Sequence, residues 1–217
     1  MAEVLVLVEQ DAEGALKKVT SELITAARAL GTPSAVVVGK PGSADGILDG
    51  LKEAGAEKIY VAESDDAGSY LITPQVDVLA SIAETASPAG ILVAATADGK
   101  EIAGRLAVRL GSGVLADIVD VKEGGVGIHS IFGGAFTVDA QAKGEVPVFS
   151  IRPGGVEAAR RVEQPDIGED RIGHQRSFRP GPRERMSSTA MRTATPISTC
   201  SPITLRLGSS ATALSIS

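Results

Sequence analysis

The chain has 217 residues, and 43% of them are hydrophobic but only 3% aromatic, so its core consists mainly of Val, Ile, Leu and Ala. The single cysteine, Cys200, excludes an internal disulfide framework and a cysteine-based metal site. The net charge is −6, and no apolar run approaches the roughly 18 residues that a membrane-spanning helix needs. The N-terminus enters an apolar strand without the pattern of a signal peptide. We therefore expect a cytoplasmic chain without membrane insertion.

Strands and helices alternate through the first 121 residues. Short apolar runs bounded by Gly, Pro or polar residues predict buried strands, and apolar residues three and four positions apart predict amphipathic helices between them. In chain order, the predicted elements are strand 3–9, helix 14–31, strand 34–39, helix 47–54, strand 58–62, helix 74–85, strand 90–95, helix 99–110 and strand 114–121. A strand, a helix and a further strand form the repeating unit of a parallel sheet covered by helices.

The pattern changes after residue 121. A turn over 122–127 precedes three short strands, at 128–132, 135–142 and 146–151, which are separated by glycine-containing turns. We expect these strands as antiparallel additions at the edge of the sheet. The predicted fold class is α/β: a three-layer, Rossmann-like, mostly parallel sheet with antiparallel edge strands. This domain covers residues 1–157.

Residues 158–217 differ in composition from that domain. All eight lysines precede residue 160, whereas residues 160–217 contain nine of the thirteen arginines, together with 9 Ser, 6 Thr and 5 Pro. Because periodic apolar residues are missing, we expect a disordered tail, in which a short strand at 203–207 is conceivable. We interpret the change as out-of-frame reading of a GC-rich coding region. A genuine divergent tail is the alternative.

The glycine-rich segments of the domain do not form a nucleotide fingerprint. The first strand–helix junction, residues 9–14 (EQDAEG), has one glycine and is acidic, so it repels a pyrophosphate. Residues 39–43 (GKPGS) contain no Walker motif, and residues 111–113 (GSG) follow a helix and are more simply its C-terminal cap. Thr96 and the N–H groups of 98–100 could form an anion site at a helix N-terminus, but that geometry is generic to the fold.

His129 is the only histidine of the predicted domain, and it lies in a predicted edge strand. No Asp with Ser or Cys stands near it in the sequence, which favours a surface histidine over a catalytic one. The acidic residues are spread along helix faces, as on a solvated surface. From the residues alone we assign no catalytic, cofactor-binding or metal-binding residue, and we expect no nucleic-acid partner.

Three passages resemble the alpha subunit of electron transfer flavoprotein (FixB type). Residues 4–31 are similar to the family's opening strand and helix, and residues 146–158 (VPVFSIRPGGVEA), with Arg152, to the strand that closes its first domain. Residues 95–121 resemble the signature A-T-x-x-G-[RK]-[DE]-[LI]-A-x-R-L-A, followed by an Asp shortly after the helix. The residues that fit it are Thr96, Gly99, Lys100, Glu101, Ala103, Arg105, Leu106, Ala107 and Asp117.

The resemblance implies an electron carrier rather than an enzyme. Such a subunit pairs with a beta subunit, accepts electrons from flavin dehydrogenases, including acyl-CoA dehydrogenases of fatty acid beta-oxidation, holds them on FAD and passes them towards the respiratory chain. In the family, FAD lies mainly in a second domain, whose motifs do not occur after residue 158. The resemblance therefore implies that this chain alone does not bind FAD and that its electron transfer is impaired.

Two other functions stay open at this point. The domain could be an independent α/β module that binds AMP or ATP, because the family's beta subunit carries AMP. It could also be a ligand-free protein whose basic tail contacts an acidic partner.

Overall fold

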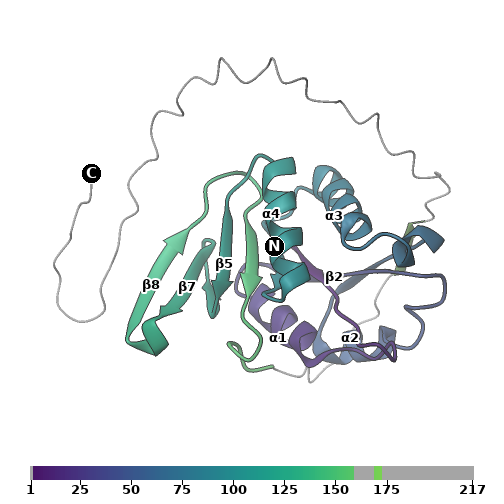
Figure 1. The fold of residues 1–217 in the computed structure, drawn as a ribbon, viewed down its shortest axis with the longest axis horizontal. Helices are drawn as coiled ribbons and strands as arrows, with labels where there is room; N and C mark the ends of the chain where they lie inside the picture. Colours follow the sequence, from purple (N-terminus) through teal and green to yellow (C-terminus); the bar gives the residue numbers. More distant parts are fainter. Residues whose placement is uncertain (1, 159–168, 173–217) are drawn as a thin grey trace, which may run out of the picture.

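The computed structural model describes residues 2–158 and 169–172, and they form an α/β fold (Figure 1). The helices are α1 (Lys18–Ala27), α2 (Leu48–Ala54), α3 (Thr73–Ala86) and α4 (Ala97–Arg109), with short 3-10 turns η1 (Asp65–Gly68) and η2 (Phe132–Gly134). The strands are β1 (Glu3–Leu7), β2 (Thr32–Gly39), β3 (Lys58–Glu63), β4 (Gly90–Ala94), β5 (Val114–Ile118), β6 (Asp120–Lys122), β7 (Val126–Ile131), β8 (Phe136–Gln141), β9 (Val148–Ile151) and β10 (Glu169–Ile172).

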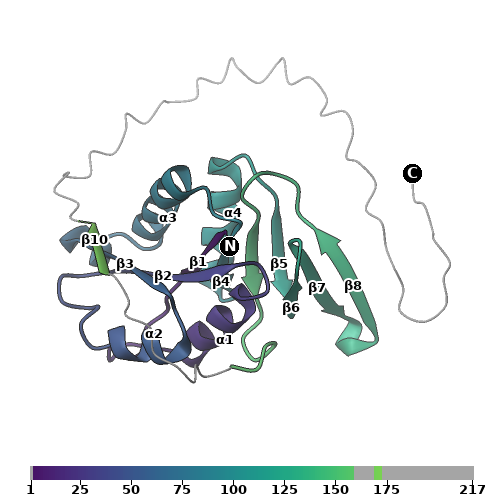
Figure 2. The same ribbon diagram turned by 180° about the vertical axis from the view of Figure 1, so that it is seen from behind.

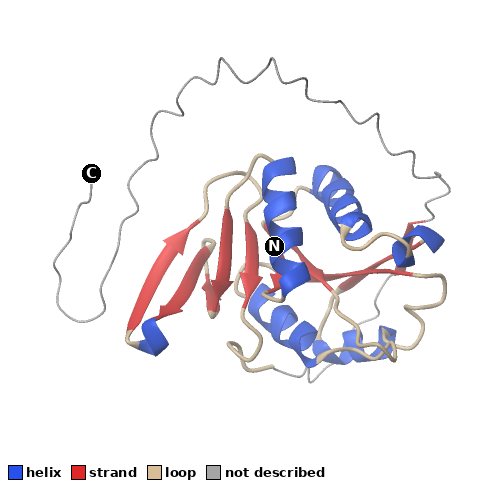
Figure 3. Ribbon diagram, in the orientation of Figure 1, coloured by secondary structure: helices blue, strands red, loops and turns tan. Residues whose placement is uncertain are grey.

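A parallel sheet of seven strands, in the order β10-β3-β2-β1-β4-β9-β5, forms the middle layer. Helices α1 and α2 cover one face, and α3 and α4 cover the other (Figure 3). Strands β6, β7 and β8 form a separate antiparallel sheet beside β5 (Figure 2). The α/β class and the mostly parallel sheet predicted from the sequence are confirmed.

Two apolar cores lie on the two faces of the sheet. Side chains alternate along a strand, so Val4 and Val6 of β1 pack towards α1 and α2, while Leu5 and Leu7 pack towards α3 and α4. Every residue of β4 is buried, as expected for a strand that is covered on both sides. Leu106 of α4 is fully buried in the second core.

The strands after residue 121 differ from the predicted arrangement. The antiparallel strands form their own sheet instead of extending the edge of the parallel one. The prediction that residues 146–151 form an edge strand is wrong, because β9 lies between β4 and β5 and pairs in parallel with both. All four β9 residues are buried, and a short strand without exposed positions is typical of the interior of a sheet.

The N-terminal end of α1 also differs from its prediction. The side chain of Asp11 accepts hydrogen bonds from the N–H groups of Glu13 and Ala15 at 3.1 and 2.7 Å, which holds this segment as a turn. Helix α1 consequently begins at Lys18 rather than at residue 14. By contrast, Gly111 follows α4 with φ +60°, as the predicted C-terminal cap requires.

Most of the predicted tail lies outside the described residues, including 203–207 and Cys200. Its described part, β10, is a strand that the sequence did not predict, and it pairs in parallel with β3. Within the described ranges, none of the helices combines the length and the apolar character that crossing a membrane requires. The same residues contain no group of three or more His, Cys, Asp or Glu side chains placed to hold a metal ion.

Candidate functional site

The order of the parallel strands reverses between β1 and β4. After β1 the chain adds β2 and β3 on one side, and it then places β4 on the other side of β1. In open α/β sheets, ligands bind in the crevice at the carboxyl ends of the strands at such a point. Here a cavity of about 500 Å³ is lined by residues that follow β1 and by the start of α4.

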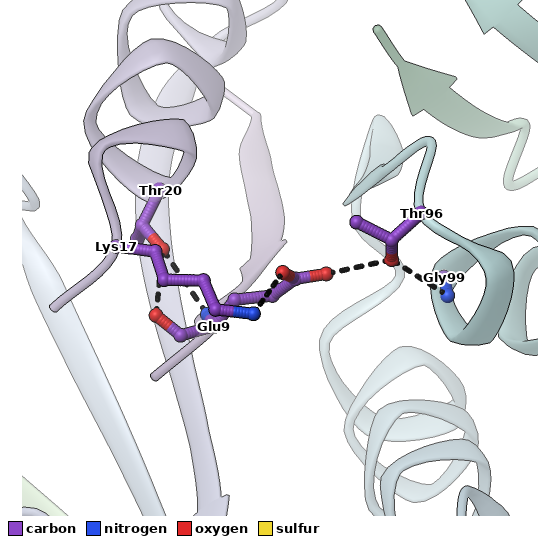
Figure 4. A network of polar contacts seen from close by, with 5 residues as sticks. All are labelled: Glu9, Lys17, Thr20, Thr96 and Gly99. Atoms are coloured by element: carbon purple, nitrogen blue, oxygen red, sulfur yellow. Dashed lines mark hydrogen bonds and ion pairs between the residues drawn. The ribbon is translucent and has the colours of Figure 1, made fainter. Parts of the chain in front are cut away.

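Polar side chains in this crevice are already bonded to one another (Figure 4). Thr96 is the N-cap of α4, and its hydroxyl accepts a hydrogen bond from the N–H of Gly99 at 3.1 Å. The same hydroxyl donates to Glu9 Oε1 at 2.9 Å. Glu9 Oε2 lies 3.2 Å from the Lys17 ammonium, and the Glu9 N–H donates to the Thr20 hydroxyl at 3.1 Å. The end of β1 is thereby tied to both α1 and α4.

The charges of the crevice do not suit a phosphate group. Glu9, Asp11 and Asp98 line it together with one cation, Lys17. The Glu9 carboxylate lies at the start of α4, where it accepts a hydrogen bond from Thr96. The positive end of the helix dipole, which would stabilise a bound anion, therefore already faces a negative charge of the same chain. The acidic junction thus places a carboxylate beside the start of α4, and the hydroxyl of Thr96 donates to that carboxylate.

The start of α4 also lies very close to β4. A Cβ atom added to Gly99 would be 2.0 Å from the carbonyl oxygen of Ala94, so a larger residue requires the helix to move. The glycine of the signature segment therefore permits close helix–strand packing. This physical role needs no bound cofactor.

The second glycine-rich loop, residues 39–43, is occupied in the same way. The N–H groups of Gly42 and Ala44 both donate to Glu63 Oε1, at 2.9 and 3.4 Å. In a phosphate-binding loop these groups would contact the ligand. The loop therefore binds a carboxylate of its own chain, consistent with the sequence-based rejection of a phosphate loop.

Three of the signature and resemblance residues meet at the carboxyl ends of β5 and β9. Arg152 contacts Asp117 with two hydrogen bonds, of 2.8 Å from one terminal nitrogen and 3.3 Å from Nε, and Lys100 lies 3.7 Å from the same carboxylate. Asp117 has φ +60° at an irregularity of β5, and its N–H donates to the buried hydroxyl of Ser150 at 2.9 Å. The Arg152 hydrogen bond is the main cause that lowers the pKa of Asp117 below its ordinary 3.8.

The loop that follows β9 is held by a carboxylate that sequence reasoning missed. Glu22 of α1 has an exposed fraction of only 3%, and its Oε2 accepts a hydrogen bond from the Gly154 N–H at 2.7 Å. Its other oxygen lies 3.6 Å from the Lys18 ammonium. Only the helical position of Glu22 beside apolar residues hints at burial, and no sequence signal indicates a partner 132 residues away.

His129 lies in β7, opposite Val138 of β8. It is therefore in the middle strand of the antiparallel sheet, and the prediction from the sequence that it lies in an edge strand is wrong. The side chain is partly exposed. A catalytic role gains no support from this position.

The described residues define a Rossmann-like α/β domain in which the glycine-rich loop at residues 39–43 and the crevice after β1 both bind internal carboxylates. Residues 4–172 match the model of the family described as "Electron transfer flavoprotein domain". The chain therefore belongs to the electron transfer flavoprotein domain family.

Individual relatives support the same assignment. The chain is 73% identical over 158 residues to the electron transfer flavoprotein subunit alpha of Mycobacterium tuberculosis, an alignment that covers 73% of this chain and 49% of that protein. The corresponding protein of Mycobacterium leprae is 68% identical over the same length and with the same coverage. A probable mitochondrial alpha subunit of Cryptococcus neoformans is 34% identical over 153 residues, which is 68% of this chain and 44% of that protein. The chain spans about half the length of the curated relatives that it matches.

Proposed function

We propose that this chain supplies the first α/β domain of an electron transfer flavoprotein alpha subunit, as an electron-carrier component and not as an enzyme. The observation that carries this proposal is the family match over residues 4–172 together with 73% identity to the Mycobacterium tuberculosis subunit. In this function the domain is a scaffold, and its polar networks hold strand and helix ends in place. A cytoplasmic location stays a prediction.

We further propose that the described residues do not hold FAD. A dinucleotide site needs free backbone donors at a glycine-rich helix start. Here Glu9 bonds to the cap residue of α4, and Glu63 bonds to the N–H groups of Gly42 and Ala44. Two negative charges thus stand where a pyrophosphate would have to bind. The same argument disfavours the AMP- or ATP-binding alternative.

The proposed partner is an electron transfer flavoprotein beta subunit. Dehydrogenases, among them acyl-CoA dehydrogenases, would deliver electrons to the whole complex and not to this domain. This proposal is supported by the relatives, whose names identify them as alpha subunits. The third alternative, a ligand-free protein that binds an acidic partner through its basic tail, depends on residues outside the described part.

The division of the chain at residue 157 also stays a proposal. The family match continues to residue 172, and β10 pairs in parallel with β3. We propose that frame disruption accounts for the altered composition of the tail. Reading the coding DNA in its other two frames after codon 157 tests this proposal. We expect one of these frames to encode the flavin domain without interruption. The absence of such a domain from both other frames would contradict it.

Co-expression with the beta subunit tests the main proposal. We expect a complex that can be purified but that lacks stoichiometric flavin absorption at about 350–500 nm. The intact Mycobacterium tuberculosis alpha subunit, expressed in the same way, serves as the positive control. A full flavin spectrum, or reduction by an acyl-CoA dehydrogenase with its substrate, would overturn the proposal that this chain does not hold FAD. Heat from AMP or ATP titrated into the chain would favour the nucleotide-binding alternative.

A further inference from the structure

A second cavity, of about 440 Å³, lies at the carboxyl ends of β2 and β3. Its lining comes from Val38 of β2, Ala62 of β3, the turn η1 and one side of α3. The chain between β3 and α3 contains η1, a 3-10 turn of only four residues, and so short an element leaves a hollow beside α3. The volume falls within the range of small-molecule sites, about 300–1,000 Å³.

Part of the lining is apolar. Val38 and Val78 are partly buried and pack against the second core, and Ala62 is only 6% exposed. Tyr70, from the segment that precedes α3, adds an aromatic side chain that is 46% exposed. We call these four residues the apolar wall of the cavity. An alkyl group that enters the cavity removes apolar surface of this wall from water, which favours binding.

The α3 side of the cavity is a stripe along the helix. Pro74, Asp77, Ser81 and Glu84 line the cavity at three- and four-residue spacing, so they lie on one face of α3. The opposite face carries buried residues such as Leu79. With a rise of 1.5 Å per residue, the stripe extends for about 15 Å along the helix axis. This length suits a linear molecule better than a compact one.

Negative charge dominates the lining of the cavity. Among the described residues that line it are four carboxylates, those of Glu63, Asp66, Asp77 and Glu84, and one cation, Arg109. Arg109 belongs to α4, which lies beside α3 (Figure 1), and its guanidinium forms an ion pair with Asp77. The cation of the cavity is thereby already neutralised by a carboxylate of the same chain. An anionic ligand would meet the remaining negative charges and be repelled.

Two of the carboxylates have no partner of their own. Glu63 accepts hydrogen bonds from two backbone N–H groups, at 2.9 and 3.4 Å. By contrast, no hydrogen bond or ion pair within the described ranges engages the carboxylate of Asp66 or of Glu84. A cavity with an apolar wall and unpaired carboxylates is complementary to a ligand that combines positive charge with hydrocarbon.

We propose that this cavity binds a linear alkyl polyamine. The methylene chain lies against the apolar wall, and ammonium groups pair with Asp66 and Glu84, as charge-assisted donors to carboxylates. A polyamine meets all three requirements, because it is linear, cationic and built from methylene groups. This site is independent of the proposed beta subunit and of FAD. Failure of the test below therefore leaves the proposed function unchanged.

Titration calorimetry of the full chain with two diamines tests the proposal. The probes are 1,8-diaminooctane and 1,3-diaminopropane, which carry the same charge and differ only in the number of methylene groups. We expect the longer diamine to bind about tenfold more tightly, because its additional methylene groups contact the apolar wall. Binding of the longer diamine should also weaken as the salt concentration rises, since the carboxylates are partly exposed.

Charge-removing variants locate the site. Asp66→Asn and Glu84→Gln should each weaken binding of 1,8-diaminooctane about threefold, the effect of a partly exposed ion pair. The matched control is Glu53→Gln on α2, which removes the same charge from an exposed position on the other face of the sheet. We expect unchanged affinity for this control. Circular dichroism and urea unfolding, which should not change, show that each variant keeps its fold.

Three results would overturn the inference. Equal affinity for the two diamines would show that charge alone attracts them and that the apolar wall contributes nothing. An equal loss of affinity in Glu53→Gln and in the two cavity variants would mean that the acidic chain attracts cations generally. Absence of binding of 1,8-diaminooctane to the wild-type chain at low salt would rule out the site itself.

Discussion

Replacing Thr96 by valine should destabilise the domain far more than a surface threonine normally does. Valine keeps the shape of threonine and removes only the hydroxyl. That hydroxyl caps α4 by accepting from the Gly99 N–H and donates to the Glu9 carboxylate. Both partners then lose a hydrogen bond in a part-buried position, which valine cannot replace.

The magnitude is set by the two contacts. Loss of an N-cap costs about 1 kcal/mol. Loss of a hydrogen bond to a charged group costs about 1.5–3 kcal/mol, and here the lower half applies because the Glu9 side chain is 16% exposed and also paired with Lys17. The expected loss in the free energy of unfolding is about 2–3 kcal/mol. For a folded part of this size, the unfolding midpoint falls by roughly 4–12 °C.

Urea unfolding followed by circular dichroism measures this loss, with an unchanged dependence on denaturant as the sign of an unchanged fold. Thr96→Ser retains the hydroxyl and should differ from wild type by less than about 0.5 kcal/mol. The matched control is Thr85→Val on α3, where an exposed hydroxyl only bonds back to the Ser81 carbonyl oxygen at 3.0 Å. A Thr96→Val protein as stable as Thr85→Val would refute the argument. So would a double-mutant cycle with Glu9→Ala that shows no coupling between the two side chains.

Three further predictions concern α4 and the strand ends beside it. Gly99→Ala should lower the free energy of unfolding by about 1–3 kcal/mol, because the added Cβ atom meets the β4 backbone. Gly104→Ala on the same helix should raise it by about 0.5–1 kcal/mol, because the added Cβ atom there meets no other atom within 4 Å. In thermal or urea unfolding, Leu106→Ala should lower the free energy of unfolding by about 2–5 kcal/mol, because this side chain is fully buried. Arg105→Ala should lower it by less than about 0.5 kcal/mol, because the arginine side chain is 53% exposed. The reverse order would mean that the orientation of the helix is wrong. The lowered pKa of Asp117 stabilises the fold at pH values above its ordinary pKa of 3.8, and this contribution disappears as the pH falls through the lowered pKa. The unfolding midpoint of wild type should therefore fall faster below about pH 4 than that of Asp117→Asn. Parallel curves for the two proteins would contradict the ion pair.

Much of the domain could be predicted from local patterns. The run at residues 90–95 predicts a strand buried on both faces, and β4 is fully buried. Apolar residues at helical spacing predicted the helix at 99–110, and α4 extends over Ala97–Arg109 with Leu106 in the core. These features depend on neighbours within a few positions, through side-chain alternation in strands and the 3.6-residue helical repeat. The resemblance to the flavoprotein family rests on the same segments.

Contacts between distant segments were decided by the tertiary structure alone. The composition of residues 146–151 marks a strand, but no local pattern states that β9 enters between β4 and β5 instead of at the edge. Asp117 and Arg152 come from different strands, and Glu22 meets Gly154 only because α1 packs beside the loop after β9. The order of strands and the packing of helices set these contacts. Periodicity shows which face of an element is buried, but it does not show which other element covers that face.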